Sequence, residues 1–581
     1  MKRLKRIKIR EGPNERLIRI LLIVMGLPLA LAVLLPVGDL FLKAFMNNEG
    51  ELVGAGNFIT YFSNPHLYSA ILHSFYVSIV TTSISVSMAL VYAYALTRTG
   101  IRGRGFFRYV GLLPLFAPTM MHAIALIYLF GNRGLFTTGF FDVLPWLQFD
   151  MNLYGATGII ISEVIYTFPQ AFMILVVSLS MTDYRLYEAA ETLGSNRLKI
   201  FFTVTLPGIK YGLISALFVC FTLSFTDFGA PKVVGGDYNV LAVDIYKQVI
   251  GQQNMSMGAT VGILLLLPAL AAFAADRILQ KRQSAMVTSR AMPYRLKKRK
   301  GRDIFLFTYC SIVTFLIVIL LGAVVLASSV KVWPYDLSFT MRHFTFQNVA
   351  GNGLETYLNS IMVSVLSAVL GTAIVFLTAY LVEKTRILPR LKGFIYLLAI
   401  IPMALPGLVI GLSYIFFFNR PGFPLPFTDV VLPNPLNAIY GTVAILVIAN
   451  IVHFFAVSFI TATATLKKMD NEFELVSESM GVPFYKTLWR VSIPVSLPAI
   501  MEIAMYFFVN SMVTVSAVIF LYPGDFKLAA IAIVNMEEAG DTAAAAAMSA
   551  LILVTNIVVK VLYEAILKRV RRKNQRWLEN S

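Results

Sequence analysis

The chain has 581 residues, of which 57% are hydrophobic and only 14% charged, and its mean hydropathy is +0.73. These values exclude an ordinary soluble domain and indicate a protein that crosses a membrane several times. The net charge of +18 is spread over short polar segments. We interpret it as membrane topology and attraction to anionic lipid headgroups, and we expect no nucleic-acid partner. Cys220 and Cys310 both lie in apolar stretches, so we expect no disulfide, metal or other cofactor.

The first apolar run follows Arg19 and is too long for the core of a signal peptide. A run of about 20 apolar residues is needed to span the hydrocarbon core. This criterion predicts an all-α polytopic membrane fold with about 12 transmembrane helices. The predicted spans are residues 17–42, 68–96, 108–130, 155–180, 209–229, 257–276, 304–330, 358–382, 393–418, 438–464, 495–521 and 543–566.

The positions of lysine and arginine predict the orientation, because cytoplasmic loops retain positive charge. With both termini inside the cell, most of the 49 lysines and arginines fall on the cytoplasmic side. The strongest basic segments are residues 2–10, 98–108, 280–303 and 568–573. We therefore expect a multi-pass protein with both termini in the cytoplasm.

A short motif occurs twice, after predicted spans four and ten. The first copy reads EAAETLG over residues 188–194, and the second reads LVSESMG over residues 475–481. An offset of 287 residues places Glu191 on Glu478, Gly194 on Gly481 and Pro207 on Pro494. A duplicated loop at one offset indicates two fused copies of one membrane unit. The repeat is parallel, because each half has six spans and begins inside the cell.

Each copy predicts a short helix that ends at its glycine in the left-handed conformation. In the first copy we expect helix over residues 185–193, a second helical stretch over 196–205, and a change of direction at Pro207. Ala189 and Ala190 would keep one helix face thin enough to enter a groove, and Glu188 and Glu191 would meet basic groups on a partner. The alternative is a polar hairpin that only connects two spans.

The motif resembles the coupling loop, or EAA loop, of the permease subunits of type I ATP-binding cassette (ABC) importers. With two such loops in one chain, the sequence is similar to the fused permeases of the iron(III), thiamine and 2-aminoethylphosphonate importers. It is most similar to the 2-aminoethylphosphonate permease. This resemblance is carried by residues 112–118, 128–132, 226–232 and 244–254. In the second loop, Leu475-Val476-Ser477 replaces Glu-Ala-Ala, and Glu474 lies one place early.

The resemblance implies a MetI-like fold in the cell inner membrane and two copies of an ABC ATPase subunit, one on each loop. It also implies an extracytoplasmic substrate-binding protein and no catalysis by this chain. The ATPase-coupling residues it assigns are Glu188, Ala189, Ala190, Glu191, Gly194, Leu206 and Pro207 in the first loop, and Glu474, Ser477, Glu478, Gly481, Ile493 and Pro494 in the second.

On this reading the chain has six parts. They are a cytoplasmic N-terminus with the first span (1–66), a first permease domain (67–279), a basic cytoplasmic linker (280–303), the seventh span with an outer loop (304–354), a second permease domain (355–567) and a basic cytoplasmic tail (568–581).

Other functions fit the sequence less well. The sequence has no G-x-x-x-x-G-K-[ST] motif, so ATP is expected on a separate chain. The basic glycine loop at residues 97–105 superficially resembles a loop of major facilitator transporters but lacks their aspartate. No nucleophile, carboxylate or metal cluster suggests a membrane enzyme. Iron(III), thiamine, polyamines and inorganic oxyanions remain alternatives to 2-aminoethylphosphonate as the cargo.

Polar residues inside predicted spans suggest function, because a charge in hydrocarbon costs about 2.5–3.5 kcal/mol. The candidates for a pathway or gate are His122, Glu163, Asp227, Asn450 and His453. The alternative is that they form hydrogen bonds between neighbouring helices. The candidates for a hinge are the matched pairs Pro114 and Pro118, and Pro402 and Pro406.

Two outer segments, residues 240–252 and 528–538, have an amphipathic pattern. We expect them to form part of the platform on which a substrate-binding protein docks.

Overall fold

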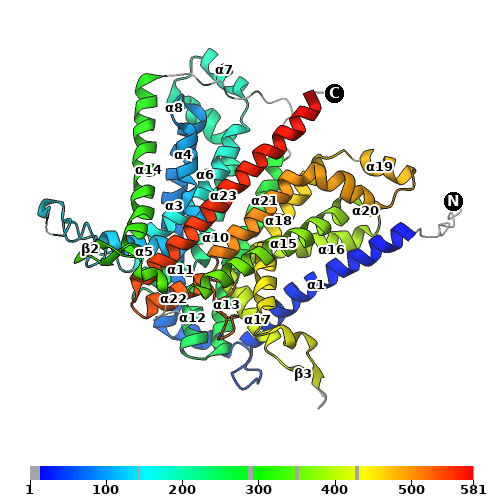
Figure 1. The fold of residues 1–581 in the computed structure, drawn as a ribbon, viewed down its shortest axis with the longest axis horizontal. Coiled ribbons are helices and arrows are strands. Elements are labelled where there is room, and N and C mark those ends of the chain that lie inside the picture. The colour runs from blue at the N-terminus through cyan, green and yellow to red at the C-terminus, as the bar shows by residue number, and fades with distance from the viewer. Residues whose placement is uncertain are drawn as a thin grey trace.

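The computed structural model describes residues 13–141, 143–284, 292, 294, 296, 299–346, 353–424, 431–470 and 472–579. Long helices from both halves pack together, and two small hairpins lie at the edge (Figure 1). The basic segment at residues 2–10 lies outside the described residues, as do residues 285–291, 293, 295, 297 and 298 of the predicted linker at 280–303.

The elements of the first half are α1 Pro13–Ala44, α2 Gly56–Ser63, α3 Pro65–Arg98, α4 Arg104–Gly111, η1 Leu113–Phe116, α5 Thr119–Phe130, η2 Pro145–Leu147, α6 Ala156–Ser180, α7 Tyr184–Thr192, α8 Arg197–Ile200, η3 Phe201–Thr205, α9 Leu206–Gly208, α10 Lys210–Thr226, α11 Gly229–Val234, α12 Leu241–Tyr246, η4 Lys247–Gly251 and α13 Met255–Ser284.

Those of the second half are α14 Lys300–Ser328, β1 Val330–Val332, β2 Asp336–Phe339, η5 Arg342–Thr345, α15 Glu355–Lys384, α16 Pro389–Ile400, η6 Ile401–Ala404, α17 Gly407–Phe418, β3 Gly422–Pro424, β4 Val431–Pro433, η7 Pro435–Ile439, α18 Val443–Lys468, α19 Glu472–Ser479, α20 Phe484–Thr487, η8 Leu488–Ser492, α21 Ile493–Val513, α22 Ala529–Glu538 and α23 Thr542–Glu579. The strands form two antiparallel hairpins, β1 with β2 and β3 with β4.

Among the described residues, nine helices are long and apolar enough to cross a membrane unbroken. Three further helix pairs pass the same test together but are bent, which gives up to twelve spans. The bent pairs are Arg104–Phe116 with Thr119–Phe130, Arg197–Gly208 with Lys210–Thr226, and Pro389–Ala404 with Gly407–Phe418. The predicted all-α membrane fold is confirmed, and predicted spans three, five and nine are the bent ones.

The bends in spans three and nine lie at the predicted proline pairs and measure 102° and 113°. Pro118 and Pro406 are the N-caps of α5 and α17, and Pro114 and Pro402 begin the tight turns η1 and η6. A proline has no N–H to donate and disfavours helix in the residue before it, so each pair ends one helix before the next begins. The predicted breaks are confirmed, and the hinge role stays a prediction.

Small side chains allow the helices of each half to approach closely. Between α3 and α6, the Thr167 hydroxyl donates a hydrogen bond to the Ser85 hydroxyl at 2.9 Å. Between α15 and α21, the ring of Phe507 lies so close to Gly371 that a Cβ there would meet it at 2.9 Å. Such contacts stabilise helix association in lipid, where no hydrophobic effect drives the helices together.

The first helix of each half packs against the opposite half. α1 contacts α16 and α17 of the second half, and α14 contacts α3, α4 and α5 of the first. Asp39 of α1 pairs with Arg420, which follows α17, at 3.4 Å. Tyr92 of α3 shares a hydrogen bond with Thr314 of α14 at 3.1 Å. α1 and α14 therefore each pack against the opposite half and help to hold the two halves together.

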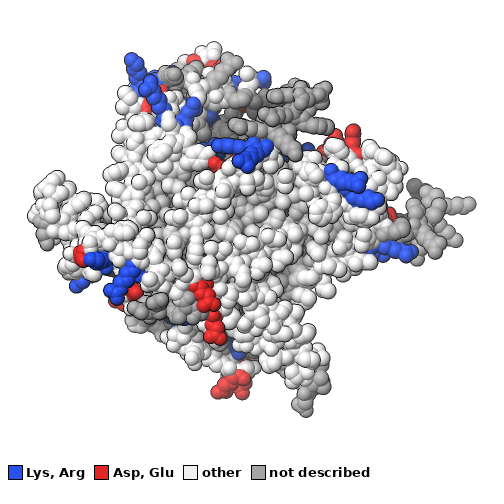
Figure 2. Space-filling model, in the orientation of Figure 1, with Lys and Arg blue, Asp and Glu red and all other residues white. Residues whose placement is uncertain are grey.

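The start of α1 and the end of α23 lie on the side of the molecule that carries α7 and α19 (Figure 1). We call this the loop side, and we call the opposite side, with α12, α22 and the hairpins, the outer side. Most of the face in view is free of charged residues, as membrane contact requires (Figure 2). Lysine and arginine lie mainly at its edges.

The amphipathic segments on the outer side are buried. The first N–H of α12, at Leu241, donates to the Ser74 hydroxyl at 2.9 Å, and that of α22, at Ala529, donates to the Ser360 hydroxyl at 2.7 Å. Almost every side chain of both helices is inaccessible to solvent. The prediction that these segments form an exposed docking platform is therefore wrong for most of their length, because both helices insert between the spans.

Candidate coupling surface and translocation pathway

The first loop (residues 183–208) is ordered by caps at both ends of α7. The Asp183 carboxylate accepts a hydrogen bond from the Arg185 N–H at 3.1 Å, which holds the pKa of this carboxyl below its usual value. After α7, Gly194 has a φ of +70°. No atom lies within 4 Å of a Cβ built there, so the left-handed backbone, not crowding, favours glycine.

The second loop (residues 470–495) follows the same backbone path, with Gly481 at a φ of +68°. The Ser195 N–H bonds to the Ala190 carbonyl at 3.0 Å, and the Val482 N–H bonds to the Ser477 carbonyl at 2.9 Å. Both are the long hydrogen bond of a Schellman ending. The predicted helix ending at glycine is confirmed in both loops, and helical turns resume at α8 and α20.

Each loop exposes four large apolar side chains at matched positions, and we call these eight residues the docking face. At an offset of 287 residues the pairs are Leu186 with Phe473, Leu193 with Met480, Leu198 with Tyr485, and Phe202 with Trp489. Leu193 is 83% exposed and Met480 is 73% exposed. Exposed apolar groups on polar loops mark a protein contact. These residues were not predicted from the sequence, although their repeated spacing is visible there.

The predicted coupling residues do not all face solvent. Glu188, Ala189, Glu191, Glu478, Pro207 and Pro494 are exposed, whereas Leu206, Ile493 and Ser477 are half-buried. Ala190 is only 9% exposed and faces the spans. Of the two alanines, only Ala189 therefore lies on the exposed face of α7, where its small side chain keeps that face thin.

Two basic residues at the ends of α3 and α15 anchor the loops differently. Arg98 donates hydrogen bonds to the Leu179 carbonyl and the Thr182 hydroxyl, and its guanidinium lies 5.4 Å from the Tyr187 ring centre. In the second half, Lys384 lies 3.4 Å from Glu474, which occupies the position of Tyr187. Glu474 is therefore turned toward the spans, and this ion pair accounts for the acidic residue that departs from the motif.

The described residues of the linker between the halves contact the first loop. The Tyr184 N–H donates to the Met292 carbonyl at 3.0 Å, and the Met292 N–H donates to Asp183 at 3.2 Å. The ring of Tyr294 lies 4.3 Å from the Arg98 guanidinium carbon. These contacts make the first loop better supported than the second within the described residues.

The two prolines that follow the loops have different effects. The chain bends by 67° between Arg197–Gly208 and Lys210–Thr226, directly after Pro207. In the second half the helical span Phe484–Val513 continues through Pro494. Pro207 is followed by Gly208 and Pro494 by Val495, and glycine permits the sharper bend. The change of direction predicted at Pro207 is confirmed.

The predicted interior residues are only partly brought together. Glu163 of α6 lies beside Asp227 at the end of α10, close enough for their charges to interact. Asp227 also accepts a hydrogen bond from the Ala230 N–H at 2.9 Å. His122 is fully buried in α5, and its ring nitrogens have no hydrogen-bond partner among the described residues.

In the second half, Asn450 is fully buried and both side-chain polar atoms lack a partner among the described residues. The His453 ring lies 4.5 Å from the Phe454 ring. No hydrogen bond or ion pair joins Asn450 or His453 to Glu163 or Asp227 in the part of the chain that the structure describes. The five predicted residues therefore form one acidic pair and separate polar positions.

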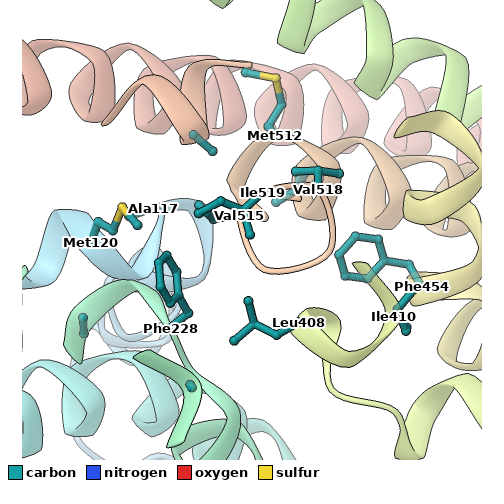
Figure 3. Close-up of a cluster of buried hydrophobic side chains, with 14 of the residues drawn as sticks. Ala117, Met120, Phe228, Leu408, Ile410, Phe454, Met512, Val515, Val518 and Ile519 are labelled. Atoms are coloured by element: carbon teal, nitrogen blue, oxygen red, sulfur yellow. The ribbon is translucent and has the colours of Figure 1, made fainter. Parts of the chain in front are cut away.

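Apolar side chains from both halves meet near the outer side. Phe228, directly after Asp227, converges with Leu408, Val515 and Ile519 (Figure 3). The Phe228 ring lies 5.2 Å from Tyr246, whose ring lies 6.5 Å from Phe520 of the other half. The halves are thus in contact at this level, and we call these residues the outer closure.

Comparison with known families decides the class of protein. Residues 82–285 and 376–572 match the family described as "Binding-protein-dependent transport system inner membrane component". The chain belongs to this family. Family membership makes it a transport subunit, a multi-pass membrane permease of an ABC importer, and implies an ATPase and a substrate-binding protein as partners.

Two ferric permeases align with nearly the whole chain, and a polyamine permease homologue aligns with part of it. The ferric transport system permease protein FbpB of Actinobacillus pleuropneumoniae is 26% identical over 92% of this chain and 76% of its own length. A putative ferric transport system permease of Haemophilus influenzae is 25% identical over 90% of this chain and 81% of its own length. A spermidine/putrescine permease homologue of Mycoplasma genitalium is 28% identical over 30% of this chain and 57% of its own length.

Proposed function

We propose that this chain forms the whole translocation pathway of its importer and that two copies of one ATPase subunit grip its two loops. The observation that carries the proposal is the docking face, which repeats in position and in apolar character on two helices with the same Schellman ending. A helix that enters a groove is a common mode of recognition, and its apolar side chains supply most of the contact energy. ATP hydrolysis then takes place on the partner.

In the mechanism we propose, a substrate-binding protein outside the inner membrane delivers cargo to the outer side, and both termini and both loops lie in the cytoplasm. Closure of the ATPase dimer moves the loops toward each other and rocks the halves, which opens the outer closure. To shift the ratio of inward-facing to outward-facing conformations from 1:99 to 99:1 requires about 5.5 kcal/mol of differential binding. Hydrolysis resets the loops.

The cargo we infer is iron(III), because two relatives named as ferric permeases align along almost the whole chain. The second candidate is 2-aminoethylphosphonate, favoured by the motifs at residues 112–118, 128–132, 226–232 and 244–254. Thiamine and polyamines are further alternatives. The test is ATPase activity of the reconstituted importer, stimulated by its binding protein loaded with each solute in turn.

The coupling proposal is tested by mass spectrometry of the intact complex and by ATPase affinity. We expect two ATPase subunits per chain, and we expect Leu193→Glu with Met480→Glu to weaken their binding at least about tenfold. Leu52, which is 74% exposed in the loop after α1, provides the matched control Leu52→Glu. Binding of one ATPase only, or equal affinity in both variants, would contradict the proposal. Uptake without any ATPase would instead indicate a facilitator.

A further inference from the structure

Four polar side chains from both halves gather around the end of α10. Glu163 and Tyr166 come from α6, Asp227 follows α10, and Tyr506 comes from α21 of the other half. α6 packs against α10, where the Cys220 thiol donates to the Thr167 carbonyl at 3.7 Å. This packing brings Glu163 and Tyr166 near Asp227, and Tyr506 lies near Tyr166. We call these residues the acidic cluster.

Among the described residues Glu163 has no basic partner, and the ionisable group beside it is Asp227, a second acid. Glu163 is fully buried, and neither carboxylate oxygen has a hydrogen bond within the described ranges. No lysine or arginine of the described residues forms an ion pair with Glu163 or Asp227. Two adjacent carboxyl groups in hydrocarbon must either hold a proton or bind a cation, because a pair of bare negative charges there is strongly unfavourable.

The fold itself does not need acids at these positions. At the offset of 287 residues, Glu163 corresponds to Asn450 and Asp227 to Thr514, and the second half has the same helices with these neutral residues. The acidic pair is therefore a feature added to one half of a duplicated framework. This points to a ligand rather than to helix packing.

The acidic cluster lies directly next to the outer closure. Asp227 precedes Phe228, which stands among apolar side chains of both halves (Figure 3). Glu163 is inaccessible, whereas Asp227, Tyr166 and Tyr506 each keep part of their surface accessible. A solute that passes the outer closure would meet these side chains.

We propose that the acidic cluster is a contact site for a positively charged group of the cargo. Carboxylate and phenol oxygens suit a hard metal cation, and the faces of the two tyrosines also suit an ammonium group. The inference rests on the proposed import function and deepens it, because it assigns a cationic cargo and disfavours an oxyanion. Iron(III) and the ammonium group of 2-aminoethylphosphonate share this chemistry.

The first test measures binding to the purified full chain in lipid nanodiscs, with terbium(III) as the probe. Terbium(III) is a hard trivalent cation whose luminescence is sensitised by nearby tyrosines. We expect Glu163→Gln with Asp227→Asn to weaken the tyrosine-sensitised site at least about tenfold. The control Ser364→Ala, at a buried polar position of α15, should leave it unchanged. Iron(III) or 2-aminoethylphosphonate should displace terbium(III), according to which is the cargo, and molybdate should not. An unchanged signal in the double variant overturns the proposal and leaves a shared proton as the explanation.

The second test measures uptake by the importer reconstituted with its ATPase and binding protein. Glu163→Gln should lower uptake of the cationic cargo at least about tenfold and leave the ATPase activity stimulated by the loaded binding protein intact. Uptake within about twofold of wild type would refute the site. If the wild-type importer transports neither solute, the proposed cargo fails, while loss of terbium(III) binding in the double variant would still support the site.

Discussion

The ammonium of Lys232, in α11, lies 2.7 Å from the carboxylate of Glu538, at the end of α22. This ion pair joins the two halves on the outer side, and the same ammonium lies 4.9 Å from the centre of the Tyr246 ring. In the mechanism we propose, contacts that bridge the halves at the outer closure separate when cargo enters. The described conformation is thus closed on its outer side.

Cross-linking across this pair should arrest transport. We expect Lys232→Cys with Glu538→Cys, joined by a short bifunctional thiol reagent, to abolish uptake, because α11 and α22 then cannot separate. Cleavage of the cross-link should restore uptake. Both native cysteines are buried, so they leave little background. Uptake that continues through complete cross-linking would show that the halves do not part here.

Closure should also depend on pH through Glu537. Burial raises the pKa of the Glu537 carboxyl from 4.5 to about 7 in α22, which lies outside the spans. Opening exposes this group to water and lowers its pKa, so the closed form binds more protons between these values. Closure should therefore be strongest at low pH, weaken as the pH rises toward about 7, and level off above it.

The measurement is the distance between spin labels at Asp237→Cys and Ala539→Cys, two exposed positions on the outer side of opposite halves. Glu537→Gln should hold the short distance at every pH, because the amide never ionises. The same pH dependence in wild type and Glu537→Gln would show that another group is responsible.

The glycines of the loops should be needed for coupling rather than for expression. Gly194→Val and Gly481→Val each place a side chain in the left-handed region, at about 1–2 kcal/mol. We expect the double variant to hydrolyse ATP but to lose uptake, because α7 and α19 no longer end in the shape that transmits motion. Gly105→Val is the control, since Gly105 is exposed in α4 without a positive φ or a close neighbour. Equal losses in all variants would argue against a special role for the loops.

The ion pair of Glu474 should support the second loop from within. Lys384 is only 1% exposed, so Glu474→Ala leaves a buried ammonium with less compensation and should destabilise the loop by about 1–3 kcal/mol. Glu478→Ala, on the exposed face of α19, should change stability by less than about 0.5 kcal/mol. The rate of limited proteolysis in the loop and the thermal unfolding temperature should be measured for both variants. A similar effect of both changes would contradict the anchoring role.

Local patterns in the sequence were sufficient for much of the fold. Apolar run length predicted the spans, the proline pairs predicted two sharp bends, and Gly194 and Gly481 predicted two helix endings. These features depend on a few neighbouring residues, so a single sequence reveals them.

Features that depend on distant partners were missed. Residues 240–252 and 528–538 have the pattern of surface helices, yet most of their side chains are buried because Ser74 and Ser360 hold α12 and α22 between spans. The role of Glu474 was likewise assigned from its place in the motif, whereas Lys384, which decides its orientation, lies far away in the chain. The exchange of α1 and α14 left no signal, since apolar helices look alike whichever neighbour they choose.

That exchange has a consequence for how the polypeptide is made and cut. α1 packs against α13 of its own half and against α16 and α17, which are synthesised much later, so part of its packing site forms only after the second half has entered the bilayer. In contrast, α14 packs against α3, α4 and α5, which have been synthesised before it. If the gene were divided between the halves, the first fragment would leave one face of α1 without its packing partners. The two fragments would regain the native packing only by associating with each other.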